Sequence, residues 1–194
     1  MVGGRAWVFV AGLVCGGLAL GGVTEAARAA PAGYPVTGID VSAYQGQVDW
    51  ATVAAGGAKF AYMRASEQAG ILDGYFDANY QGAKANGLYA GAYHGARPGL
   101  SSGKAQADFV LDHAGYVTDG KTLPPMLDIE WPRANWPGLN ACYNMTPAQM
   151  SAWIKDFVNE IAARTGQPAV IYTNTNWWNP CTNSRPLARK RGPR

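Results

Sequence analysis

Two carboxylates separated by one residue, Asp128 and Glu130, end a run at 124–131 that is otherwise apolar. Such a run predicts a buried strand, and side chains at positions i and i+2 of a strand lie on the same face. At about 3.3 Å per residue their backbones are about 7 Å apart, the scale at which two carboxyl groups flank a glycosidic bond in hydrolases. The pair is therefore a candidate for acid catalysis, although an isolated Asp-x-Glu is more often a solvated pair at a strand end.

The first 29 residues indicate a secretory signal peptide rather than part of the fold. Arg5 precedes an apolar run over 6–23, and residues 27–29 offer the small side chains that a signal peptidase reads. A membrane anchor is the alternative, because the run is nearly long enough to span a bilayer, but its glycines dilute it. Cys15 lacks the small residues expected before a lipidated cysteine. We therefore expect a secreted, extracellular protein that is not membrane-bound after cleavage.

The remaining residues suffice for one domain with a sizeable core, over 30–183. Cys142 and Cys181 form an even pair in an exported chain, which favours a disulfide over two free thiols. Such a bridge would contribute about 3 to 4 kcal/mol if unstrained. His94 and His113 are isolated and no Cys-x-x-Cys occurs, so no metal site is expected.

The net charge of +3 at pH 7 comes from the ends of the chain. Between residues 30 and 181 there are nine Lys or Arg and twelve Asp or Glu, whereas residues 184–194 carry five basic residues and no acid. This tail has no aromatic side chain and no recognisable binding module. We therefore expect a disordered basic tail and no nucleic-acid binding.

Strand-like and helix-like segments alternate along the chain. Five apolar runs that predict strands lie at 36–42, 60–67, 88–94, 124–131 and 169–174. The helices predicted between them lie at 50–55, 74–85, 102–113 and 146–164. This order indicates parallel βα units, in a barrel or in a doubly wound sheet. No Gly-x-Gly-x-x-Gly or Walker-type loop follows the first strand, so a barrel is favoured.

In a barrel, the active site collects residues from the C-terminal ends of several strands. The predicted strand ends carry Asp40, Glu67, His94, Asp128 with Glu130, and Tyr172 with Asn174. Polar groups at five successive ends would meet at one mouth, which favours a catalytic role for the paired acids. Asp40 lies within an apolar strand, where a buried carboxylate requires either hydrogen-bond donors or a functional pocket.

Six ordered stretches resemble the glycoside hydrolase family 25 muramidases, exported lysozymes of bacteria and their phages, and the Streptomyces-type enzymes in particular. The stretches are 40–46, 62–67, 76–79, 91–94, the Asp128 and Glu130 pair, and 171–174. The resemblance implies an α/β fold, a modified and flattened β/α barrel of the TIM-barrel type. It also implies hydrolysis of the β-1,4 bond between N-acetylmuramic acid and N-acetylglucosamine in peptidoglycan. We expect a monomer that acts on peptidoglycan glycan strands without a cofactor.

The same resemblance implies roles for individual residues. Glu130 matches the general acid, whose pKa partial burial and the charge of Asp128 would raise. Asp128 matches the carboxylate that orients the substrate's 2-acetamido group as nucleophile, an inverting route with activated water being the alternative. Asp40 matches an electrostatic or water-positioning acid. The residues that would contact substrate are Glu67, Tyr93, Trp131 and Tyr172.

The chain departs from the family pattern near its end. The family continues past Trp177 and Trp178 with strands that close the barrel, whereas residues 184–194 have too few apolar side chains for a buried strand. Five strands do not close a barrel that normally needs eight. We therefore expect a catalytic domain over 30–183 that lacks the C-terminal strands, as a truncated or frameshifted product.

Two alternatives to an active muramidase stay open. One is a chitinase-like barrel, although the acids usual before its Asp-x-Glu pair are replaced by apolar residues at 123–126. The other is an inactive remnant that binds peptidoglycan without cleaving it.

Overall fold

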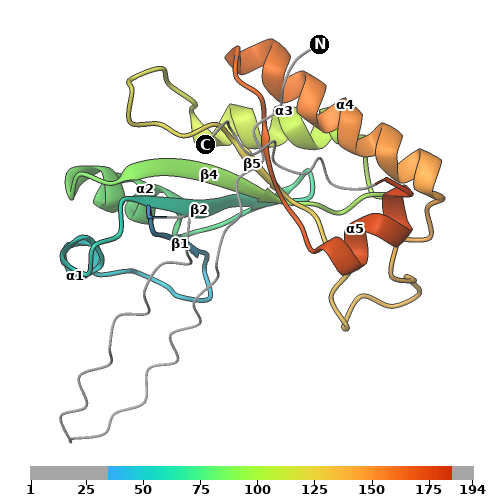
Figure 1. Cartoon of the computed structure of the whole chain (residues 1–194), viewed down its shortest axis with the longest axis horizontal. Coiled ribbons are helices and arrows are strands. Elements are labelled where there is room, and N and C mark those ends of the chain that lie inside the picture. Colours follow the sequence, from blue (N-terminus) through green and yellow to red (C-terminus); the bar gives the residue numbers. More distant parts are fainter. Residues whose placement is uncertain (1–34, 185–194) are drawn as a thin grey trace, which may run out of the picture.

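The computed structural model describes residues 35–184, so the predicted signal peptide and nearly all of the predicted basic tail lie outside the described residues. Within them, parallel strands form a sheet in the order β1-β2-β4-β5-β6 that curls into a half-barrel (Figure 1). The strands are β1 (Gly38–Val41), β2 (Phe60–Glu67), β3 (Ile71–Leu72), β4 (Tyr89–Gly95), β5 (Met126–Asp128) and β6 (Val170–Tyr172). The helices are α1 (Trp50–Ala55), α2 (Phe76–Ala85), α3 (Gly103–Ala114), α4 (Pro147–Thr165) and α5 (Thr175–Thr182).

All five predicted strands and all four predicted helices are confirmed, and with them the α/β class. Two short elements were not predicted: β3, which pairs antiparallel with β2, and α5, which follows β6 directly. In the described part of the chain, β1 and β6 are the outer strands of the parallel sheet. The barrel is therefore not closed by these residues. The predicted domain limits and the predicted truncation stay predictions.

The helix-covered face of the sheet holds the main hydrophobic core. Alternate strand residues such as Ala61, Met63 and Leu127 are buried there. Figure 1 shows α3 and α4 side by side over this face. The apolar stripe of α4 is buried in this core and includes Met150, Trp153, Ile154, Phe157 and Ile161. A helix with one such stripe is stable only when the stripe is covered, so α4 fixes the sheet from one side.

The opposite, inner face has a smaller apolar floor near the N-terminal ends of the strands. Tyr62, Met126 and Val170 are buried there, with Phe60 packed beside them. The ring of Tyr62 lies across Gly91 of β4, where any side chain would overlap it. Its hydroxyl donates a hydrogen bond of 2.9 Å to the carbonyl of Pro124. The floor excludes water from below the strand ends that carry the predicted site.

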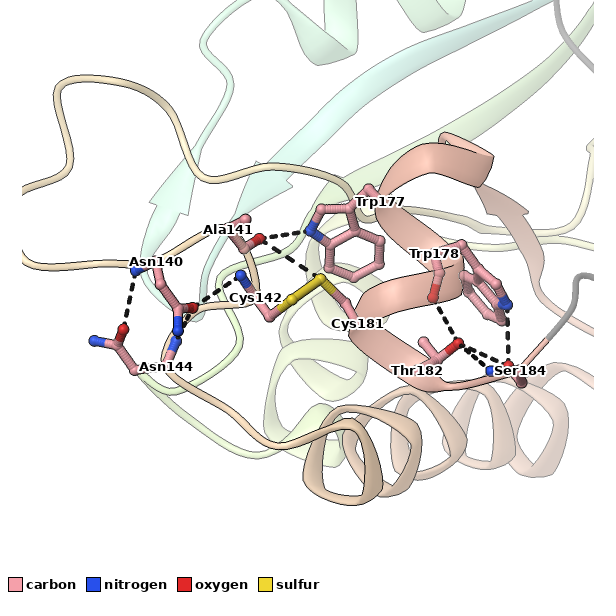
Figure 2. Close-up of a disulfide and its surroundings, with 9 residues drawn as sticks. All are labelled: Asn140, Ala141, Cys142, Asn144, Trp177, Trp178, Cys181, Thr182 and Ser184. Carbon is pink, nitrogen blue, oxygen red and sulfur yellow. Dashed lines mark hydrogen bonds between the residues drawn. A yellow bond between two sulfur atoms is a disulfide. The ribbon is translucent and has the colours of Figure 1, made fainter.

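The predicted disulfide between Cys142 and Cys181 is confirmed. It joins the loop between β5 and α4 to α5, across 39 positions of sequence, with the two Cα atoms 5.3 Å apart. Figure 2 shows the carbonyl of Ala141 beside the bridge, accepting a hydrogen bond of 2.7 Å from Nε1 of the buried Trp177. The bridge and this bond together hold α5 against the loop that follows the paired acids.

A close contact between α3 and α4 gives a first test of this packing. A Cβ at Gly103 would overlap the backbone of Trp153 and Phe157, so we expect Gly103→Ala to destabilise the protein by about 2 to 3 kcal/mol through overpacking. Urea unfolding followed by circular dichroism measures the change. Gly74→Ala is the matched control, because a Cβ there meets nothing within 4 Å. Equal stability of the two variants would contradict the packing described here.

Candidate active site

The strand register brings Asp40, Asp128 and Glu130 to the inner face. Leu127 and Ile129 are completely buried in the helix-side core, so the residues that alternate with them face the other way. β5 ends at Asp128, but the N–H of Ile129 donates to the carbonyl of Tyr172 at 3.0 Å, which carries the alternation on to Glu130. Electrostatic interactions link Asp128 to Glu130 and Asp40, and Glu130 to Asp40.

Desolvation dominates the electrostatics of these acids. It raises the pKa of Asp128 to about 7, and the charges of Glu130 and Asp40 add to the effect, while Arg133 opposes it. Desolvation also raises the pKa of Glu130, with the charge of Asp40 as the second cause. Asp40 lies partly in solvent on the open side of the half-barrel, yet the protein around the rest of its carboxyl raises its pKa too. The pair formed by Asp128 at the end of β5 and Glu130 just after it therefore retains a proton near neutral pH.

The expected cause of the Glu130 shift needs a correction. The sequence predicted that partial burial and a charged Asp128 would raise the pKa of Glu130. Burial is indeed the leading cause, but Asp40 rather than Asp128 supplies the neighbouring charge. The pKa of the more deeply buried Asp128 rises to about 7, so desolvation favours the protonated form of Asp128 more strongly than that of Glu130.

Asp128 has an unused hydrogen-bond acceptor. Among residues 35–184, its Oδ1 atom is buried and has no hydrogen-bond partner. A buried polar atom without a partner is costly and uncommon in folded proteins. A ligand N–H or O–H would relieve that cost, so this oxygen marks the point where the site favours a donor group.

Aromatic side chains surround the acids. Tyr93 and Tyr172 are partly buried, and the charges of Asp128 and Asp40 contribute to the raised pKa of both hydroxyls, after desolvation. Trp131 directly follows Glu130 and is 43 % exposed. Tyr93 and Tyr172 thus lie near the acids, and Trp131 presents an exposed ring one residue after Glu130.

Glu67 lies at the same mouth, but its carboxylate is already paired with cations. It is only 5 % exposed and forms ion pairs with three arginines, Arg64, Arg97 and Arg133. Its Oε1 accepts from Nε of Arg97 at 2.8 Å and its Oε2 from Nη2 of Arg133 at 2.8 Å. In this arrangement the carboxylate of Glu67 positions the three arginine side chains.

The loop after Asp40 is fixed by two buried polar residues of the next βα unit. Asp73 accepts hydrogen bonds from the backbone N–H of Ala43 at 2.8 Å and from Nε of Arg64 at 2.9 Å. Asn79, which is 1 % exposed, accepts from Nε1 of Trp50 at 3.1 Å and donates to the carbonyl of Gly46 at 2.9 Å. Polar side chains buried in this way rigidify the loop because each of them is satisfied.

The comparisons with known proteins agree with this geometry. A family model described as glycosyl hydrolases family 25 matches residues 39–191. The chain belongs to glycosyl hydrolase family 25. It is 46 % identical over 150 residues to lysozyme M1 of Streptomyces globisporus, across 77 % of this chain and 50 % of that protein. It is 40 % identical over 153 residues to an N,O-diacetylmuramidase of Chalaropsis sp., across 77 % of this chain and 71 % of that protein.

Solved structures give the same family. The bacterial lysozyme from Streptomyces coelicolor is 45 % identical and superposes with a TM-score of 0.72, over 76 % of this chain and 67 % of that one. A muramidase from Trichobolus zukalii is 40 % identical with a TM-score of 0.72, over 76 % and 70 %. The described half-barrel is therefore part of the family 25 β/α barrel. The chain spans about half the length of lysozyme M1.

Two residues predicted at the mouth of this family 25 domain lie elsewhere. His94 is completely buried on the helix-covered face, between Ser66 Oγ at 2.9 Å and Gln106 Oε1 at 2.8 Å. The period of two in β4 explains this, because Tyr93 takes the inner face. Asn174 caps α5, its Oδ1 accepting from the N–H of Asn176 at 2.9 Å. Neither joins the acids.

The site also contains residues that the sequence did not single out. Tyr143 is 5 % exposed, and the charges of Asp128 and Glu130 contribute to the raised pKa of its hydroxyl, so it lies near the acids. Arg133 acts on Asp128 from the same loop. No local pattern marks either residue, because both lie in an irregular segment. Asn79 stood in a stretch that carried the resemblance, and its loop-anchoring contacts explain its presence there.

Within residues 35–184, no three His, Cys, Asp or Glu side chains are grouped so as to hold a metal ion. No helix in that part of the chain is long and apolar enough to cross a membrane.

The buried His94 gives a test of the fold by pH. Burial lowers its pKa to about 4, so the unfolded chain, with a histidine pKa near 6.5, binds the proton first. The contribution of His94 to the free energy of unfolding is complete above about pH 6.5 and falls by about 3 kcal/mol as the pH drops to 4. Asp128 acts in the opposite direction over this range, so the difference between wild type and His94→Gln isolates the histidine. Unfolding free energies measured in urea at several pH values test this.

The control for that experiment is His113→Gln, which replaces an exposed histidine of α3. We expect it to keep the pH slope of the wild type. If His94→Gln also keeps that slope, His94 is not buried in its neutral form.

Proposed function

We propose that this protein is a lysozyme, an N-acetylmuramidase that hydrolyses the β-1,4 bond between N-acetylmuramic acid and N-acetylglucosamine in peptidoglycan. The observation that carries the proposal is the inner-face pair of Asp128 and Glu130, which holds a proton near neutral pH beside an unused acceptor on Asp128. Membership of glycosyl hydrolase family 25 supports it, as do relatives named lysozyme and N,O-diacetylmuramidase.

The chemistry assigns different tasks to the two acids. The acetamido N–H of the substrate donates to Oδ1 of Asp128, which favours the ionised form of that carboxyl and moves the shared proton to Glu130. Glu130 then donates this proton to the glycosidic oxygen as the C1–O bond breaks. The acetamido oxygen bonds to C1, and the carboxylate of Asp128 offsets the positive charge that develops. The bond from the acetamido oxygen to C1 closes a five-membered ring. A water molecule that Glu130 activates as a base later attacks C1, opens this ring and restores the acetamido group.

Other residues would support these steps. Asp40, partly in solvent, would stabilise charge or position the attacking water, and it would gain importance in an inverting route where water attacks directly. Tyr93, Trp131 and Tyr172 would flank the sugar rings, whose flat faces pack well on aromatic side chains. Glu67 would contact substrate only if one of the three arginines released a carboxylate oxygen of Glu67.

We also propose that the protein is secreted. Two features support this: the leader-like pattern of residues 1–29 and the Cys142–Cys181 disulfide, which is typical of oxidising compartments. Peptidoglycan outside the cell membrane would be its substrate, and we expect a monomer.

A second candidate function is peptidoglycan binding without cleavage. It is favoured by the open outer strands β1 and β6 of the described sheet. A cleft with an open side would bind glycan chains but hold the acids less firmly for catalysis.

Reducing ends released from purified peptidoglycan test the proposal. We expect wild type to release them and Glu130→Gln to lower kcat at least about 100-fold, because amide nitrogen cannot donate the proton that general acid catalysis needs. Glu160→Gln on α4, where Glu160 pairs with Lys104, is the matched control and should stay active.

The other outcomes discriminate the alternatives. Binding of peptidoglycan in a pull-down without release of reducing ends would support the second candidate. Hydrolysis of chitin in preference to peptidoglycan would support a chitinase-like enzyme instead.

A further inference from the structure

Arg133 bridges two distant segments directly beside the acids. It lies three residues after Glu130, in the loop between β5 and α4. Its Nη1 donates to the hydroxyl of Tyr44, 89 residues away, and its Nη2 to Oε2 of Glu67, 66 residues away, both at 2.8 Å. The guanidinium thus ties the loop that follows Glu130 to the loop after β1 and to the end of β2.

The bridge has a rigid base. Glu67 is 5 % exposed and its carboxylate is also held by Arg64 and Arg97. The guanidinium of Arg97 lies 3.6 Å from the ring centroid of Trp136, and that of Arg133 lies 5.6 Å from the same ring. The side chain of Arg133 is 40 % exposed, so its hold comes from the buried carboxylate of Glu67 and from the cation–π contacts that orient its planar guanidinium.

The charge of Arg133 acts on Asp128 from this fixed position, and it is the cation that counters the other groups there. Glu130, Asp40 and Glu67 all raise the pKa of Asp128. The titratable and charged groups around Asp128 are Asp40 from β1, Arg64 and Glu67 from β2, Tyr93 from β4, Glu130 and Arg133 from its own segment, Tyr172 from β6, and Tyr143.

We propose that Arg133 is a positioning residue of the active site: anchored by Glu67 and Tyr44, it holds the loop that follows Glu130 against the loop after β1 and the end of β2. From this position its charge also acts on Asp128. The inference rests on the proposed lysozyme function for its catalytic consequence. Its electrostatic part concerns the free protein. Among residues 35–184, the guanidinium of Arg133 donates to Tyr44 and Glu67 rather than to either acid, so it acts through charge and loop position.

The test compares Arg133→Gln with Arg164→Gln, a matched loss of one arginine where α4 meets α3. Carboxyl carbon chemical shifts of Asp128, followed by NMR against pH, give its titration midpoint in the absence of substrate. We expect Arg133→Gln to raise the midpoint by about half a unit to one unit, and Arg164→Gln to leave it unchanged. Arg133→Lys keeps the charge and should restore most of the midpoint.

Kinetics on peptidoglycan provide the second readout. We expect Arg133→Gln to move the acid limb of the pH–kcat profile upward by a similar amount, because the reaction needs ionised Asp128, and to lower kcat about tenfold, with KM changed less than about threefold. Tyr44→Phe removes one anchor but no charge, so it should lower kcat without moving the limb.

The outcomes separate this inference from the proposed function. If wild type releases no reducing ends but Arg133→Gln shifts the Asp128 midpoint, the lysozyme proposal fails and the electrostatic role of Arg133 stands. If the midpoint and the acid limb both stay at their wild-type values in Arg133→Gln, the inference is overturned, whatever the activity of wild type.

Discussion

The carboxyl group of Asp128 sits on the inner face of the half-barrel, beyond an apolar floor of Tyr62, Met126 and Val170. Its Oδ1 atom is buried without a partner in the described part of the chain. A charge in such a place is costly, so the carboxyl holds its proton to about pH 7. The strand alternation, the loop anchors and the arginine cluster all hold this desolvated carboxyl in place.

Burial of this carboxyl lowers the stability of the native state, but the proposed reaction needs the carboxyl to be buried. An acid whose pKa rises on folding makes the native state less stable as the pH rises through the raised value. The surrounding structure compensates with the α3–α4 packing and with the Cys142–Cys181 bridge, which ties the catalytic-side loop to α5. A site of this kind is typical of enzymes, in which local strain is offset by a rigid scaffold.

Most of the fold could be predicted from the sequence, because its strands and helices have strong periodic patterns. The 146–164 prediction for α4 is nearly the observed Pro147–Thr165, since Thr146 forms a capping box with Gln149 and Gly166 ends the helix. The two-residue β3 and the eight-residue α5 are too short to produce a pattern.

The site was predictable in part, for a different physical reason. Strand spacing alone places Asp128 and Glu130 on one face. It does not say which face a strand-end residue takes, and this is why His94 was placed at the mouth although it lies in the core. Tertiary hydrogen bonds decide the rest: three arginines converge on Glu67 from segments far apart in sequence. No local pattern encodes that convergence.

The most direct measurement is the NMR titration of the Asp128 and Glu130 carboxyl carbons in the wild-type protein, free of ligand. The structure predicts an Asp128 midpoint near pH 7, with Asp128 titrating at a higher pH than Glu130. An Asp128 midpoint near 4, the value of a solvated aspartate, would show that the carboxyl is not buried and would contradict the site described here.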